Sequence, residues 1–288
     1  MSMEIEFLGT GGSTTTPRFG CSCERCGLAR SKGAPYVRWG PSIFIHGPDV
    51  LIDTPEEIAV QLARSSVSHI RACFYSHWHP DHVMGRRIWE YNKILRTWPL
   101  SEKKEPVPVY LPQGVARDFK RRYDLWAYFS LLQDQGLVKI HVVKDSEHVL
   151  INGYKFSPFV LGESGIYGFG VSGSGQEIAV VPDELFGWKP SSDLKGSLNV
   201  AILPAGVFEF HPLSGERLID PSHPVLKNEA TFEQTLEVAR TLGAKRTYLT
   251  HIEEVDPITF DELEKIAQMS STRHVSIQFA HDTLRVKL

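Results

Sequence analysis

Residues 76–82, SHWHPDH, decide the fold, because three histidines and one aspartate fall within six consecutive positions. The apolar run IRACFY at residues 70–75 comes directly before them and predicts a buried strand. The sequence from residue 81 or 82 to about residue 95 predicts a helix. The polar cluster is therefore expected on a short loop between a strand and a helix.

The side chains of this loop have the spacing of a metal site. A strand end fixes the backbone, and the loop beyond it directs the alternate residues His77 and His79 toward one point. Asp81 and His82 are adjacent, so they point in different directions and can serve a second point nearby. Imidazole nitrogens and carboxylate oxygens suit Zn²⁺, Fe²⁺ or Mn²⁺. The alternative is a solvated polar loop, which the density of the pattern disfavours.

The rest of the chain alternates predicted strands with predicted helices. Strands are predicted at residues 4–8, 42–46, 50–53, 107–111, 138–143, 148–151, 155–161, 168–172, 177–181, 199–203, 246–250 and 275–279. Helices are predicted at residues 55–64, 113–132, 231–242 and 259–269. This order predicts two sheets with helices on their outer faces, in one domain.

The composition is that of an ordinary soluble protein, with 42% hydrophobic and 23% charged residues. A net charge of −3 is too small to predict a nucleic-acid or membrane partner from bulk electrostatics. No apolar run reaches the roughly 18 residues of a membrane span, and the opening MSMEIEFLGTGG does not read as a secretory signal. A cytoplasmic location and no membrane partner are the default expectations.

Three of the four cysteines, Cys21, Cys23 and Cys26, form a C-x-C-x2-C cluster. Thiolates this close favour a borderline metal such as Zn²⁺, and a loop without regular structure gains from such a clamp. The alternative is three reduced cysteines without a metal. Cys73 lies in a predicted buried strand and is expected to be a core residue.

With these motifs in order, the chain resembles the metallo-β-lactamase superfamily, whose signature is HxHxDH. By this resemblance Asp53 in LIDT supports a ligand histidine, Asp183 in IAVVPD bridges two metals, and His251 in YLTHIEE is the last histidine ligand. The implied fold is an α/β four-layer αβ/βα sandwich that spans residues 1–288 as a single domain.

The opening FLGTGGSTTTPRFGCSCERC is most similar to the cyclic-phosphate phosphodiesterases of the carbon–phosphorus lyase pathway, and more distantly to tRNase Z. In those phosphodiesterases a matching cysteine trio holds a structural zinc, together with a histidine just after the last catalytic histidine. Glu254 occupies that histidine's position here. The resemblance therefore implies zinc held by three cysteines and Glu254, or by the cysteines and another histidine such as His223.

Two more glutamates stand where the resemblance leads us to expect histidines. Glu163 follows the strand YKFSPFVL at the place of a metal ligand. Glu229 takes the place of the histidine that donates a proton to the leaving group, with His223 a few residues upstream. A carboxylate ligand makes the site less positive and favours Mn²⁺ or Fe²⁺ over Zn²⁺. Glu229 can act as an acid only if its surroundings raise its pKa toward neutrality.

The resemblance implies two divalent ions, Zn²⁺, Mn²⁺ or Fe²⁺, that share an attacking hydroxide. The first ion is expected on His77, His79 and Glu163, and the second on Asp81, His82 and His251, with Asp183 between them. The expected catalytic residues are Asp81, Asp183, Glu229 and His223.

These features predict a metal-dependent hydrolase, most simply a phosphodiesterase for a small cyclic or nucleotide-like phosphate. One alternative keeps the fold but hydrolyses a lactone, a thioester or another non-phosphate ester. Another is an accessory protein that binds a metal or an intermediate without turnover. Nucleic acid is not expected as a partner, because the chain is slightly acidic and lacks a long basic arm. Relatives are often dimers, so a homodimer is the corresponding expectation.

Two further features border this site in the sequence. A basic run at residues 117–122 lies on a predicted helix, where it contacts a phosphate or RNA, or is simply a solvated face. Trp78 stands between two expected ligands, so it either walls the pocket and stacks on a substrate base or packs into the core.

Overall fold

The structure, a computed structural model, describes residues 3–93, 105–162, 165–253, 255, 257–271 and 276–288. Within these residues the chain forms two seven-stranded sheets. The first has the order β14-β1-β2-β3-β4-β5-β6, formed by Arg285–Lys287, Glu4–Gly9, Ser42–His46, Val50–Ile52, Ala72–Phe74, Val107–Pro112 and Val138–Val143. The second has the order β13-β12-β11-β10-β9-β8-β7, formed by Ile277–Phe279, Arg246–Thr250, Val200–Pro204, Gln176–Val180, Ile166–Gly173, Tyr154–Leu161 and Val149–Ile151.

Both sheets are mixed. The strands β3 to β6 are parallel to one another, as are β10 to β13, and the remaining pairs are antiparallel. In each parallel part, loops that follow the carboxyl ends of neighbouring strands meet at one edge of the sheet. Such an edge is the usual place for a binding site in an open α/β sheet.

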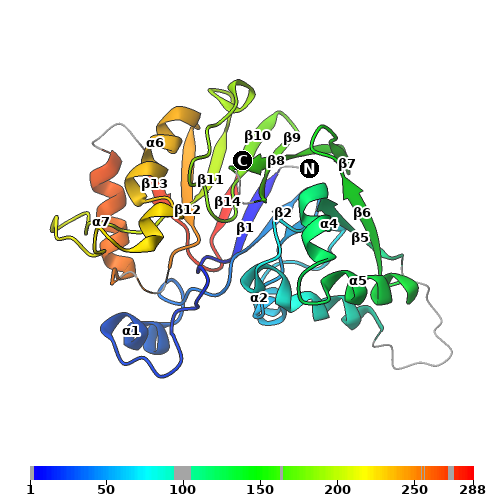
Figure 1. The fold of residues 1–288 in the computed structure, drawn as a ribbon, viewed down its shortest axis with the longest axis horizontal. Coiled ribbons are helices and arrows are strands. Elements are labelled where there is room, and N and C mark those ends of the chain that lie inside the picture. Colours follow the sequence, from blue (N-terminus) through cyan, green and yellow to red (C-terminus); the bar gives the residue numbers. More distant parts are fainter. Residues whose placement is uncertain (1–2, 94–104, 163–164, 254, 256, 272–275) are drawn as a thin grey trace.

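Helices cover the outer faces of the two sheets, with α2, α4 and α5 on one side and α6 and α7 on the other (Figure 1). The α-helices α1 to α7 are Glu24–Lys32, Ile58–Arg64, Pro80–Val83, Gln113–Phe119, Leu125–Asp134, Phe232–Leu242 and Phe260–Ser271. Three 3-10 helices, η1 to η3, are Met84–Lys93, Ser192–Leu194 and Pro224–Lys227. No helix in the described part of the chain is long and apolar enough to cross a membrane. The predicted four-layer αβ/βα sandwich is confirmed.

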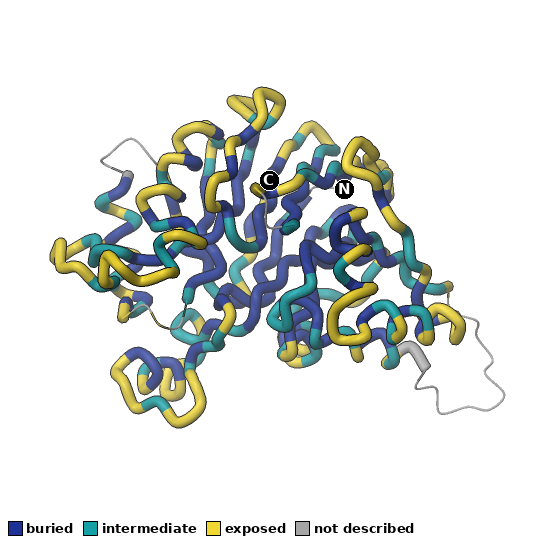
Figure 2. Tube along the Cα trace, viewed as in Figure 1, coloured by how far each residue is buried: buried dark blue, intermediate teal, exposed yellow. Residues whose placement is uncertain are grey.

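One core cluster contains buried apolar side chains from strands of both sheets. The trace in Figure 2 is coloured as buried through the centre of the molecule. Phe74 at the end of β4 stacks on Phe156 of β8, with ring centroids 5.1 Å apart, and contacts Phe169 of β9 at 5.3 Å. Phe7 of β1 contacts Tyr248 of β12 at 5.7 Å. A second cluster lies between the second sheet and α6 and α7. The shared core supports our proposal that the two sheets form a single domain.

Three predicted elements differ from the structure. The helix predicted over residues 113–132 is two helices, α4 and α5. Tyr123 and Asp124, in the turn between them, adopt left-handed φ angles of 48° and 50°, which a continuous right-handed helix does not contain. The helix predicted from residue 81 is the short α3 followed by η1, and its predicted end lies outside the described residues. The cysteine loop, expected to lack regular structure, contains α1.

Candidate metal centre

The predicted site residues follow the carboxyl ends of four strands from both sheets. Asp53 follows β3, residues 76–82 follow β4, Asp183 follows β10 by three residues, and His251 follows β12 directly. Asp53 and His251 have left-handed φ angles of 63° and 50°. Such angles are uncommon for residues other than glycine and often mark functional sites. The two sheets therefore bring residues nearly 200 positions apart to one place.

The described site residues form two groups of potential metal ligands, each with donor atoms within 4.8 Å of one another. The members of the first group are His77, His79 and Asp183, and those of the second are Asp81, His82 and His251. Asp183 faces both groups, because its Oδ2 lies 3.0 Å from His77 Nε2 and its Oδ1 lies 3.3 Å from His251 Nε2. This carboxylate has the position that a bridging ligand requires.

Three buried nitrogens identify the chemistry that these groups suit. The Nε2 atoms of His77, His82 and His251 are buried and have no hydrogen-bond partner among the described residues. Unsatisfied buried polar atoms are rare, and each calls for a physical explanation. These nitrogens lie 3.0–3.3 Å from carboxylate oxygens of Asp81 and Asp183. Imidazole nitrogens and carboxylate oxygens together are a donor set typical of divalent transition metals. The residues present therefore fit two metal ions.

The other ring nitrogens of His77 and His82, their Nδ1 atoms, are held by neighbouring side chains. Asp53 accepts hydrogen bonds from the Ser76 backbone N at 2.8 Å and from Ser76 Oγ at 2.6 Å, and it lies 2.8 Å from His82 Nδ1. Ser76 Oγ also lies 3.0 Å from His77 Nδ1. A carboxylate on Nδ1–H fixes the tautomer that leaves Nε2 free to bind a metal. The sequence suggested this role for Asp53, but it did not suggest a role for Ser76.

Charges in the groups shift the pKa values of their members. Burial lowers the pKa of His82, but Asp81 and Asp53 outweigh burial and hold it well above its usual value. Burial also lowers the pKa of His251, yet the carboxylates, Asp183 first, raise it to about 9. By contrast, burial and the neighbouring His77 lower the pKa of His79 to about 4. Protons therefore compete with metal ions for the second group, and metal affinity should fall as the pH falls.

A cavity of about 440 Å³ opens onto both groups. Its lining includes five carboxylates, from Asp81, Asp183, Glu184, Glu229 and Glu253. Burial, followed by the charges of the carboxylates of Glu253, Glu184 and Asp183, raises the pKa of Glu229 to about 7. Glu229 therefore has the environment that its expected role as an acid requires.

The structure does not bring every predicted site residue to the cavity. His223 is exposed at the start of η3, where its Nδ1 accepts a hydrogen bond from the Val225 backbone N at 3.2 Å, and it is not among the described residues that line the cavity. Glu163 and Glu254, two predicted ligands, lie outside the described residues. The backbone N of Tyr167 donates to the Ser76 carbonyl at 3.0 Å, so the start of β9 lies beside the histidine loop.

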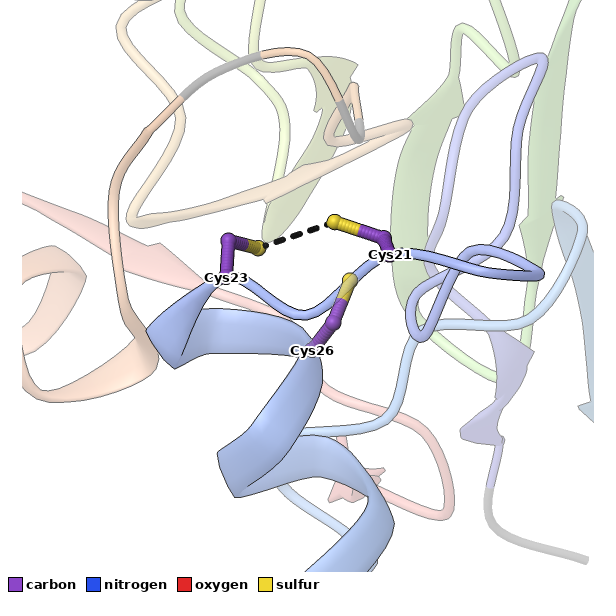
Figure 3. Close-up of side chains that lie close together, drawn as sticks. All are labelled: Cys21, Cys23 and Cys26. Carbon is purple, nitrogen blue, oxygen red and sulfur yellow. Dashed lines mark hydrogen bonds between the residues drawn. The ribbon is translucent and has the colours of Figure 1, made fainter.

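The three clustered cysteines point toward one another (Figure 3). Cys21 Sγ lies 3.3 Å from Cys23 Sγ, and Cys26 extends from the first turn of α1 toward the same point. Hydrogen bonds from the backbone and side chain of Cys23 lower the pKa of the Cys21 thiol to about 7. Three sulfurs within 4.8 Å of one another suit a zinc ion. Zinc at these cysteines stays a proposal.

Two residues that the sequence interpretation missed lie against the site. The Glu253 carboxylate lies 3.5 Å from His251 Nδ1. Glu184 accepts backbone hydrogen bonds from Ala230, at 2.9 Å, and from Phe186. Only their closeness in sequence to predicted ligands could have pointed to these two glutamates, since each stands within two residues of one.

Trp78 connects the site to the basic run. Its ring makes an edge contact with His79, with centroids 4.5 Å apart. The guanidinium of Arg122 lies over the same Trp78 ring, 4.6 Å from its centroid, and Tyr123 contacts the ring at 5.8 Å. The loop between α4 and α5 therefore reaches the rim of the first group.

A family model described as the beta-lactamase superfamily domain matches residues 48–252 of this chain. The match covers more than half of the 288 residues and includes both groups of potential ligands. The chain therefore belongs to the beta-lactamase superfamily, as its motifs predicted.

Solved structures and curated proteins agree with this assignment. A diphosphatase from the PhnP family has a TM-score of 0.70 and 26% identity, covering 100% of this chain and 98% of that one. Zinc-bound PqqB from Methylobacterium extorquens has a TM-score of 0.68 at 17% identity, covers 99% of this chain and 100% of that one, and shows the fold alone. Ribonuclease Z from Pyrococcus horikoshii is 29% identical over 114 residues, which are 39% of this chain and 30% of that protein. The match thus spans less than a third of that relative.

Proposed function

We propose that this protein is a metal-dependent hydrolase of the phosphodiesterase type, acting on a small phosphate-containing substrate. The observation that carries the proposal is the set of three buried Nε2 atoms that have no hydrogen-bond partner among the described residues and lie 3.0–3.3 Å from carboxylate oxygens of Asp81 and Asp183. The family match and the PhnP-family neighbour support the same class. Two divalent ions bound there would acidify a water and stabilise charge on phosphoryl oxygens.

The chain's own residues would divide the work as follows. His77, His79 and Asp183 would hold one ion, and Asp81, His82 and His251 the other. Asp53 and Ser76 would orient two of these imidazoles through their Nδ1 atoms. Glu163, as a further ligand, remains part of the proposal.

Glu229 would donate a proton to the leaving group. It lines the cavity, and burial together with the neighbouring carboxylates raises its pKa, which favours the protonated form that can donate. A protonated glutamate can donate its proton to a developing alkoxide just as a histidine would. His223, also expected in this role, is exposed at η3, so Glu229 is the better candidate.

The rim of the first group favours an anionic substrate. The guanidinium of Arg122 packs on the Trp78 ring, and that ring also contacts His79, a proposed metal ligand. A positive charge therefore lies at the rim of the first group. A guanidinium suits phosphate oxygens better than most groups do. We propose that Arg122 contacts a phosphate that is not attacked, as in a diphosphate or a nucleotide.

A second candidate is RNA processing, which the matches to Ribonuclease Z favour. The sequence argument against a nucleic-acid partner rests on net charge and is not confirmed. The basic run beside the site could serve an RNA backbone equally well.

Metal content and hydrolysis test the proposal together. Protein purified without added metal or chelator should hold about two ions at the histidine groups, and a third if the cysteines bind zinc. Bis(p-nitrophenyl) phosphate and a nucleoside diphosphate should be hydrolysed, and Asp183→Asn should lose both the ions and the activity. Glu264→Gln, an exposed carboxylate on α7, is the matched control and should change neither.

Three outcomes would redirect the assignment. Cleavage of a tRNA precursor alone would favour the second candidate. Hydrolysis of lactones or thioesters alone would favour a non-phosphate hydrolase. Binding of no ion after incubation with Zn²⁺, Mn²⁺ and Fe²⁺ would reject the hydrolase and favour an accessory protein.

A further inference from the structure

The last proposed ligand, His251, has an acidic neighbour that no resemblance led us to expect. Glu253 stands two residues after His251, and its Oε1 lies 3.5 Å from His251 Nδ1. The other ring nitrogen, Nε2, faces Asp183 at 3.3 Å and Asp81 at 3.6 Å. The imidazole is therefore placed between a carboxylate at its back and the proposed metal position at its front.

The carboxylate of Glu253 is itself held in place from the far end of the chain. The backbone N of Ser13 donates to Glu253 Oε1 at 3.2 Å, and Ser13 Oγ donates to Oε2 at 3.0 Å. The supporting backbone is fixed as well, because Gly12 N donates to the Ile252 carbonyl at 3.2 Å. Both carboxylate oxygens therefore have a donor besides the histidine.

Gly12 leaves the space that this carboxylate occupies. A Cβ atom built on Gly12 would overlap the carboxylate of Glu253. The conformation at Gly12 does not require glycine, since its φ is not positive. The absence of a side chain thus has a local reason, which is close approach by Glu253.

We propose that Glu253 is the positioning residue for His251 and thereby sets the affinity of the second ligand group for its metal ion. Ser13 holds the carboxylate of Glu253 by two hydrogen bonds in the space beside Gly12. A carboxylate beside Nδ1 favours the tautomer that carries its proton on Nδ1 and leaves the Nε2 lone pair free, and it makes the imidazole a stronger donor. Each of the three buried site histidines then has a dedicated partner, with Ser76 behind His77 and Asp53 behind His82. The proposal rests on the two-metal site described under the proposed function.

Chelator competition with Zn²⁺ on the full-length protein tests the proposal without a substrate. Glu253→Ala should lower the Zn²⁺ affinity of the second group by about 10–100-fold and leave the Zn²⁺ affinity of the first group unchanged. Glu253→Gln keeps an acceptor oxygen without the charge, so it should lie between wild type and Glu253→Ala. The Zn²⁺-binding step that is lost in His82→Ala is the one that belongs to the second group.

Two variants perturb the clamp without changing Glu253. Ser13→Ala removes the hydroxyl that donates to Glu253, and Gly12→Ala displaces the Glu253 carboxylate. Both variants should therefore lower the Zn²⁺ affinity of the second group. Glu264→Gln is again the matched control. The thermal midpoint of the metal-free protein should stay close to the wild-type value in every variant, which separates positioning from a general loss of structure.

Each result decides between separate ideas. If wild type binds two ions and Glu253→Ala binds both with unchanged affinity, the role of Glu253 is rejected while the proposed function stands. Equal weakening of both ions would also reject it, since a positioning residue acts on one group. If wild type binds no ion at the histidine groups, the proposed function itself fails.

Discussion

At the residue scale, the charge state of Glu229 links the cavity to a measurable pH dependence. Its pKa is raised to about 7, first by burial and then by neighbouring carboxylates. A raised pKa favours the protonated carboxyl, so the acid form is present below this pKa and is lost as the pH rises through it. Bound cations would lower this value, which places the loss at or below about pH 7.

We predict that kcat for a poor leaving group falls with rising pH through this range, and that Glu229→Gln removes this limb of the profile. Glu229→His should restore activity, because histidine titrates in the same range. The measurement is the pH dependence of kcat for the wild type and the two variants. An unchanged profile in Glu229→Gln would show that another group donates the proton.

Single residues differ in how well the sequence predicts them. His77, His79 and the Asp81–His82 pair could be grouped from the sequence because they lie within six positions. Their grouping with Asp183 and His251 could be expected only from a resemblance. Glu253 could not be identified, since its place depends on Ser13, 240 positions earlier.

At the scale of elements, the loop between α4 and α5 brings a positive charge to Trp78, at the rim of the first group. The left-handed residues Tyr123 and Asp124 turn the chain there, and the turn places Arg122 over Trp78. Neither the break nor the ring contact is visible in a sequence that reads as one helix. The pattern of apolar residues continues through the break, so it predicts the helix face but not the turn.

We predict that Arg122→Ala raises KM for a nucleoside diphosphate by about tenfold and changes kcat little, because a guanidinium–phosphate contact contributes about 1.5–3 kcal/mol before solvent screening. KM for bis(p-nitrophenyl) phosphate, which has a single phosphate, should stay nearly constant. Arg121→Ala, the exposed neighbour, is the matched control. An equal rise of KM for both substrates would show that Arg122 does not contact a second phosphate group.

Strands were the most predictable elements. β2, β6 and β12 have the bounds that apolar and β-branched runs predict. The three-residue β14 was missed, because a short edge strand is defined by its partner β1 rather than by its own sequence. Helix α1 was missed because its sequence, ERCGLARSK, contains a glycine and few apolar side chains, so no helical apolar period stands out.

At the scale of the whole molecule, stability depends on the aromatic contact between the sheets. Phe74 is fully buried and contacts rings of the opposite sheet, so Phe74→Ala should lower the free energy of unfolding by about 3–5 kcal/mol. Urea unfolding of the metal-free protein measures this change. Phe19, with a relative exposure of 101%, is the matched control, and Phe19→Ala should change stability by less than about 0.5 kcal/mol. A loss below about 1 kcal/mol for Phe74→Ala would contradict a shared core.

The fold class was predictable because alternating strands and helices admit few architectures. The order of elements also predicted two sheets with helices outside them, but the contacts that join the sheets, such as Phe74 with Phe156, were not visible in the sequence because they link distant segments.

The bond between Thr10 and Asp282 has a consequence for biosynthesis. Asp282 accepts hydrogen bonds from the backbone N of Thr10 at 3.0 Å and from its Oγ1 at 2.7 Å, across 272 positions of sequence. In a chain growing on the ribosome, β1 can pair with β2 early, but Thr10 and the Gly12 segment lack Asp282, Ile252 and Glu253 until residues 252–282 have been made. If the second group binds a metal ion as proposed, we expect it to do so only after His251 and Glu253 have been synthesised.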